Sequence, residues 1–92
     1  MDEYIDNLNK EVAAKMGVEH TPEFTPATDP TLAFKLLDNI SGSLTITRTA
    51  ANGHGAWGIN VMRKQDGQWI WAGRGDADTL PIAICRLIQR MK

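Results

Sequence analysis

The sequence predicts an α+β domain, a three-stranded antiparallel meander sandwiched by helices in the order α-α-β-β-β-α. Two stripes of apolar residues at helical spacing precede a run of alternating residues, and a third stripe closes the chain. Asp66-Gly67 lies inside the alternating run and is a strong signal for a tight β-hairpin. With 92 residues, of which 42% are hydrophobic, the chain is expected to form one domain over residues 1–92.

The first helix is expected over residues 1–17. Acidic residues in its first turns suit the positive end of the helix dipole, and Gly17 is a suitable stop. Its apolar residues form a single stripe, which must pack against another element. The stripe consists of Ile5, Leu8, Val12 and Met16.

Residues 18–30 are rich in proline and threonine and read as an extended connector. A compact αβββα unit is expected to follow over residues 31–92. Its first helix runs to about Ile40, and either Asp29 or Thr31 can cap its N-terminus.

The three strands are expected over residues 43–49 and over the two arms of a hairpin that spans residues 56–73. Residues 50–55 and residues 73–78 contain glycine and polar residues and are predicted to be loops. Thr79 can cap the last helix, whose apolar residues recur at helical spacing.

The hairpin is unusual because neither of its faces is polar. A sheet with water on one side should have one polar face. A two-residue turn places Val61 opposite Ala72 and assigns every side chain to a face. One face carries Trp57, Ile59, Val61, Arg63, Ile70 and Ala72. The other carries Asn60, Met62, Lys64, Trp69 and Trp71.

Two interpretations of the second face remain open. The first helix can cover it, which is the favoured interpretation, or it can be a binding surface for a partner. The candidate partner face, called the Trp face below, consists of Trp69, Trp71, Met62 and Lys64.

Composition argues against several classes of protein. No apolar run approaches the ~20 residues of a membrane span, and the acidic N-terminus does not resemble a signal peptide. The single cysteine, Cys85, lies in an apolar helical pattern and is expected to be a buried thiol. These features predict a cytoplasmic protein.

No catalytic, cofactor or metal site is predicted, and we expect the protein not to be an enzyme. Gly53, Gly55 and Gly58 fit G-x-G-x-x-G, but a strand follows them where a dinucleotide site needs a helix. His20 and His54 have no cysteine or histidine partner at ligand spacing.

Charge is distributed unevenly along the chain. Residues 1–40 carry eight acidic and three basic residues, whereas residues 41–92 carry three acidic and seven basic residues. The acidic half can pack against the basic half, which we favour, or the basic half can face nucleic acid. Acidic residues before the last helix disfavour the double-stranded RNA-binding mode, which needs positive charge there.

The chain resembles the phage ABA-sandwich family of small bacteriophage and prophage proteins. The resemblance covers residues 29–92 and rests on D-P-T-x-A-x-x-L-L at residues 29–37, a tryptophan-bearing strand pair, and T-L-P-I-A-I-C-R at residues 79–86. It implies a sheet layered between helices and a phage-encoded accessory protein in the cytoplasm of a bacterial host. The family often continues with an alanine-rich helix, and residues 87–90 depart from that pattern.

The expected function is therefore that of a non-enzymatic accessory protein of unknown biochemical activity, acting through contacts with another protein or with a second copy of itself. The alternative is a nucleic-acid-binding module that uses the basic C-terminal half and the Trp face. The two hypotheses differ in one testable feature, because only an uncovered Trp face can stack bases.

Overall fold

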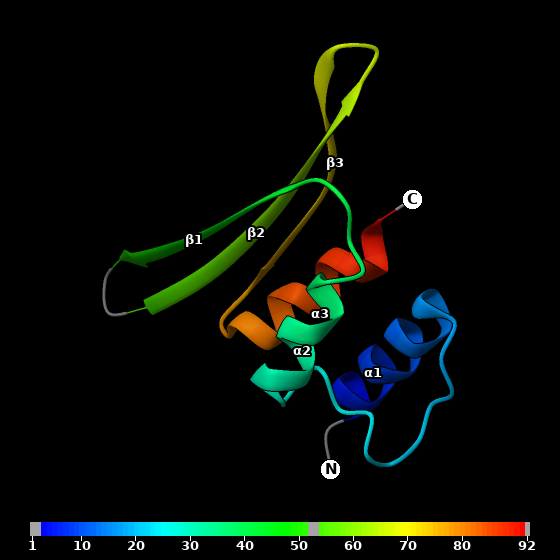
Figure 1. The fold of residues 1–92 in the computed structure, drawn as a ribbon. Coiled ribbons are helices and arrows are strands. Elements are labelled where there is room, and N and C mark those ends of the chain that lie inside the picture. Colours follow the sequence, from blue (N-terminus) through cyan, green and yellow to red (C-terminus); the bar gives the residue numbers. More distant parts are fainter. Residues whose placement is uncertain (1–2, 52–53, 92) are drawn as a thin grey trace.

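The computed structural model describes residues 3–51 and 54–91, which form a three-stranded antiparallel sheet and three helices (Figure 1). The strand order is β1-β2-β3, so the sheet is a meander. The predicted α+β class and the order of the elements are confirmed. In chain order the elements are α1 (Glu3–Met16), α2 (Pro30–Leu37), β1 (Ser43–Ala51), β2 (His54–Gln65), β3 (Gln68–Ala77) and α3 (Leu80–Arg90).

The three helices lie on one side of the sheet and, contrary to the sequence prediction, do not sandwich it (Figure 1). The helical layer covers only the face on which α3 packs. Helix α3 packs against β3 and β2, whereas α1 and α2 contact α3 and make no comparable contact with a strand. The expectation that the first helix covers the Trp face is therefore wrong. The reason is that α3 is buried on nearly all sides and needs apolar partners opposite the sheet as well. Its buried residues are Ala83, Ile84, Cys85, Leu87 and Ile88.

The hairpin turn forms as predicted, with positive φ angles of 53° at Asp66 and 80° at Gly67. The predicted register is confirmed from Gln65–Gln68 to Met62–Trp71. Beyond that pair the prediction is wrong, because Val61 pairs with Gly73 instead of Ala72. Ala72 is the extra residue of a β-bulge, and every later residue of β3 changes face.

The predicted loop over residues 73–78 is also wrong, since β3 continues to Ala77. After the bulge, Gly73 and Gly75 share a face with the fully buried Val61 and Ile59. A Cβ atom on Gly75 would overlap the backbone oxygen of Ala83 and lie 2.6 Å from the backbone nitrogen of Leu87. Residues 73–77 therefore remain part of the strand, because the two glycines leave room for α3 to pack directly against the strand backbone.

The ends of the helices agree only partly with the sequence. The Asp29 side chain caps α2 by accepting hydrogen bonds from the backbone N–H groups of Thr31 and Leu32, at 3.0 and 3.3 Å. Helix α2 ends at Leu37, before the expected Ile40. Thr79 stands at the N-cap of α3 but makes no capping hydrogen bond with its side chain. Residues 1–2 of the first predicted helix and residues 52–53 of the predicted 50–55 loop lie outside the described residues. The rest of that loop prediction is wrong, because β1 continues to Ala51 and β2 begins at His54.

The connector over residues 18–30 is held to α1 by one buried polar contact. The Asn9 side-chain oxygen accepts a hydrogen bond of 2.9 Å from the backbone N–H of Ala27, and Asn9 is itself buried. Pro26 and Ala27 are also buried, so the connector closes the outer side of the helical layer.

Substitution of the two β3 glycines should have graded effects. A Cβ on Gly73 would meet only flexible atoms, 3.1 Å from Leu87 Cδ1 and 3.2 Å from Met91 Cγ. We expect Gly73→Ala to lower the free energy of unfolding by about 1–3 kcal/mol, the usual cost of overpacking. Gly75→Ala meets backbone and should cost clearly more. Urea melts of both variants measure this, and equal losses would contradict the proposed contact with α3.

Cys85 is expected to be unreactive in the folded protein. Its side chain is fully buried in the core, and this burial raises the pKa of the thiol from 9.0 to about 12. At neutral pH both burial and the absence of thiolate should block reaction with a thiol reagent such as DTNB. We expect modification only at the rate of unfolding, with full reaction in urea. Rapid modification under native conditions would show that this part of the core opens.

Candidate functional site

The structure brings the four predicted residues of the Trp face together and leaves the tryptophans uncovered. Trp69 and Trp71 expose 57% and 63% of their surface. Lys64 pairs with Trp69 and Met62 pairs with Trp71, so all four side chains lie on the face opposite α3. The hairpin that carries them extends past the helical layer (Figure 1).

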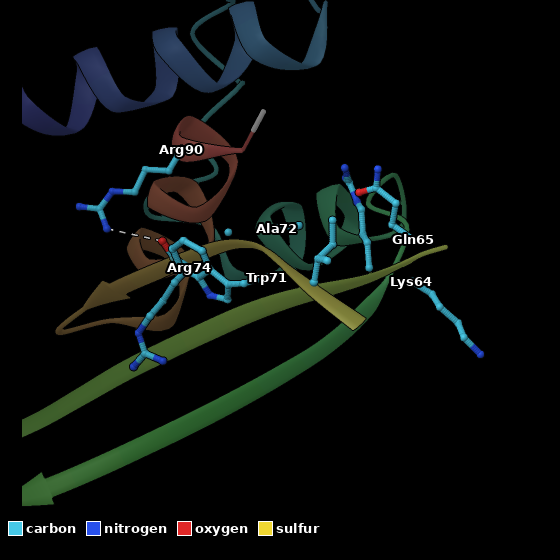
Figure 2. A pocket seen from close by; sticks show the side chains of 9 residues that line it. Lys64, Gln65, Trp71, Ala72, Arg74 and Arg90 are labelled. Carbon is cyan, nitrogen blue, oxygen red and sulfur yellow. Dashed lines mark hydrogen bonds between the residues drawn. The ribbon is translucent and has the colours of Figure 1, made fainter. Parts of the chain in front are cut away.

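A hollow of about 430 Å³ surrounds Trp71 at the bulged edge of β3 (Figure 2). Four of the nine lining residues are basic and none is acidic. The basic side chains do not converge on one point, because Lys64 extends away from the side on which Arg74 and Arg90 lie (Figure 2). The hollow therefore suits an extended anionic chain better than a single anion. The basic residues are Arg63, Lys64, Arg74 and Arg90.

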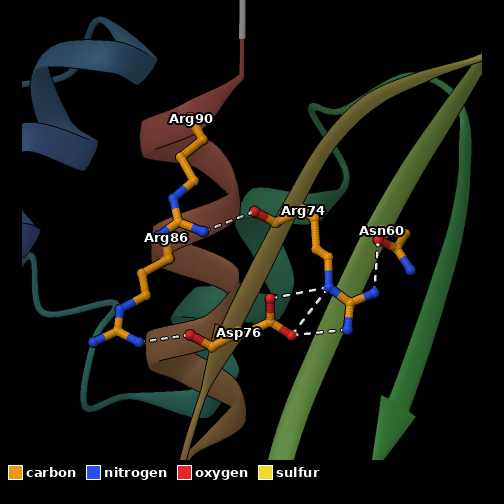
Figure 3. A network of polar contacts seen from close by, with 5 residues as sticks. All are labelled: Asn60, Arg74, Asp76, Arg86 and Arg90. Carbon is orange, nitrogen blue, oxygen red and sulfur yellow. Dashed lines mark hydrogen bonds and ion pairs between the residues drawn. The ribbon is translucent and has the colours of Figure 1, made fainter.

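A polar network continues the face beyond the hollow (Figure 3). The Arg74 guanidinium donates to the carboxylate of Asp76, with Nη2 at 2.8 Å from Oδ1, and to the side-chain oxygen of Asn60 at 3.0 Å. It lies over Gly58, where a Cβ would come within 2.7 Å of Nη2. The hydrogen bond and the charge of Asp76 raise the pKa of Arg74. Because Asp76 neutralises its charge, Arg74 contributes a fixed planar group to the face.

The arginines of α3 contact the backbone at the free edge of β3. Arg86 Nη1 donates to the backbone oxygen of Asp76 at 2.6 Å, and Arg90 Nη1 makes a longer contact of 3.5 Å with the backbone oxygen of Arg74 (Figure 3). Arg86 also donates to the hydroxyl of Tyr4 at 2.7 Å. These contacts cover that edge of the sheet.

Alternation along the hairpin already placed Asn60 on the face of the tryptophans, but the sequence did not indicate Arg90 as a neighbour of Trp71. An unbroken hairpin register would place Arg74 on the α3 side, and only the bulge at Ala72 moves it to the Trp face. No residue type at this point signals a bulge. Arg48 lies on the opposite face, with its guanidinium carbon 5.3 Å from the ring centre of Trp57.

Comparison with protein-family models, with curated proteins and with solved structures finds no match to this chain. The resemblance to the phage ABA-sandwich family thus stays a prediction from the residues. Within residues 3–51 and 54–91, no three histidine, cysteine or acidic side chains gather as metal ligands do. None of the helices described is long and apolar enough to cross a membrane.

Removal of an exposed tryptophan should affect stability little. We expect Trp71→Ala to change the free energy of unfolding by less than about 1 kcal/mol, since surface substitutions rarely cost more. Trp57 is half-buried and packs against the core. Trp57→Ala is therefore the matched control and should cost about 3 kcal/mol, near the lower end for aromatic truncation. Urea melts of both variants measure these changes. A larger loss of unfolding free energy for Trp71→Ala would show that the Trp face is covered.

Proposed function

We propose that this protein binds single-stranded nucleic acid across the Trp face. Bases stack on Trp69 and Trp71, while Lys64 on the same face and Arg90 at the edge of β3 lie near the phosphates. The observation that carries the proposal is the pair of exposed tryptophans, which lie two residues apart on one sheet face, with Trp71 lining a basic hollow. Large exposed aromatic groups mark binding surfaces, because their burial against a partner is strongly favourable.

The chemistry of the hollow supports a polyanion with aromatic groups. Stacking of a base on an aromatic side chain contributes about 1–3 kcal/mol and tolerates any sequence. The spread of the basic side chains around Trp71 matches a chain with phosphates at intervals. The planar guanidinium of Arg74 continues the row of flat groups along β3, and such planes also accept bases.

A single strand fits this surface better than a duplex. In a duplex the bases are stacked on one another, so flat tryptophan rings cannot reach them. The Trp face is a sheet surface with no helix beside it that could enter a groove. The exposed Asp78 before α3 would also repel a duplex backbone at that helix end.

A protein partner is the second candidate, which keeps the expectation of an accessory protein that acts through protein contacts. The observation that favours it is Ile70, which is exposed on the opposite face of the same hairpin arm. A hairpin that is apolar on both faces can insert between two surfaces of a partner. Binding to nucleic acid separates the two candidates.

The test is a titration of the protein with a mixed-sequence single-stranded DNA oligonucleotide at low salt, followed by tryptophan fluorescence. We expect quenching that saturates, because stacked bases contact the exposed indoles. Trp69→Ala and Trp71→Ala, followed by anisotropy of a labelled oligonucleotide, should each weaken binding about 5- to 150-fold, the equivalent of one stacked base. The matched control is Phe34→Ala, which removes an exposed aromatic ring on α2 and should leave affinity unchanged.

The salt dependence supplies a second control. Lys64→Gln should reduce the slope of log affinity against log salt by about 0.7, the value for one phosphate of a single strand. Phe34→Ala should keep the slope of the unmodified protein. Absence of quenching at low salt, or equal affinity after removal of both exposed tryptophans, would refute the proposal and leave the protein partner as the remaining candidate.

A further inference from the structure

Strand β1 is exposed on three sides. It pairs with β2 along one edge, and none of the helices makes a comparable contact with it. Every residue over 43–48 is exposed. Leu44 and Ile46 face the helical side of the sheet, like their partners Val61 and Ile59, yet they expose 36% and 41% of their surface. The helical layer therefore stops before it reaches β1.

The two edges of the sheet differ in how they are closed. Arg86 and Arg90 reach from α3 to backbone oxygens of β3, as described above. Among the described residues, the hydrogen bonds of β1 all go to β2. Strand edges with free N–H and C=O groups pair readily with another strand unless something prevents it.

The sequence of β1 contains few of the features that prevent such pairing. The nine residues Ser43–Ala51 include no proline and no lysine, and their register with β2 is unbroken by a bulge. The single charge of the strand, Arg48, is directed toward the ring of Trp57 and away from the free edge. The edge is thus regular, uncharged along most of its length, and open.

We propose that β1 pairs antiparallel with β1 of a second copy of this chain, which joins two three-stranded sheets into one of six strands. A second copy fits because antiparallel backbone edges are self-complementary. A register centred on Ile46 pairs the exposed Ile46 side chains of the two copies with each other on one face. It sets Leu44 of each copy opposite Arg48 of the other, so the two copies of Arg48 lie well apart.

The pairing has a geometric consequence for the Trp face. A two-fold axis between antiparallel strands stands normal to the sheet, so each face of the sheet continues into the same face of the partner. Both Trp faces would lie on one side of the dimer, at opposite ends of the continuous sheet. The pairing does not depend on nucleic-acid binding, since the two surfaces share no residue.

The test is the mass of the protein measured by light scattering during size-exclusion chromatography, over a range of concentrations. We expect a shift toward twice the 10.2 kDa of one chain as concentration rises. Ile46→Lys places a charge on the inner face of the strand and should give a monomer at all concentrations. Val18→Lys is the matched control, because it changes an equally exposed aliphatic residue in the connector and should leave the dimer intact.

Hydrogen exchange separates edge pairing from association through another surface. Amides of β1 should become more protected as concentration rises, while those of α3 should not change. Circular dichroism of Ile46→Lys should match that of the unmodified protein, because residue 46 is outside the core. A monomer at every concentration, or a dimer that Ile46→Lys leaves intact, would overturn the inference.

Discussion

The backbone of β3 lies directly against α3 at Gly75, and this contact decides where the other elements can go. A helix and a strand approach this closely only where the strand lacks side chains on the facing side. Gly73, Gly75 and Ala77 supply such a stripe, and Leu87 of α3 fills the space above it. The bulge at Ala72 is what turns this stripe toward the helix. The same bulge directs Arg74 to the opposite face of the sheet, the Trp face.

The position of α3 explains why the Trp face is open. Because α3 lies so close to the sheet, its own side chains project sideways and outward, and they bury against α1 and α2. Those helices are thereby committed to the outer side of α3 and cannot reach the far face of the sheet. Two of the three tryptophans therefore remain exposed to solvent, and the folded chain lacks the free energy that their burial would contribute. Binding of a partner to the Trp face would supply that free energy by burying the two side chains.

The parts of this fold that sequence predicts are those with strong local signals. Asp66-Gly67 fixes the turn, Asp29 caps α2, and period 3.6 marks α1 and α3. The membership of the Trp face also follows from alternation beside the turn. The path of β3 after Trp71 does not follow, because glycine occurs in loops and at close contacts alike. The element against which α1 packs does not follow from the sequence either. An apolar stripe shows that one face of a helix is buried, but it does not show which element covers that face.

The uneven charge of the sequence acquires a spatial meaning in this arrangement. The acidic residues over 3–38 lie on α1, in the connector and at Asp38 just after α2, in the layer beyond α3. The basic residues Arg63, Lys64 and Arg90 line the same hollow as Trp71, away from that layer. The cations beside Trp71 act on a bound chain more strongly than charges more than about 10 Å away, which are largely screened at ordinary salt. A chain with a net charge of −1 can in this way present a locally basic, aromatic surface to a polyanion.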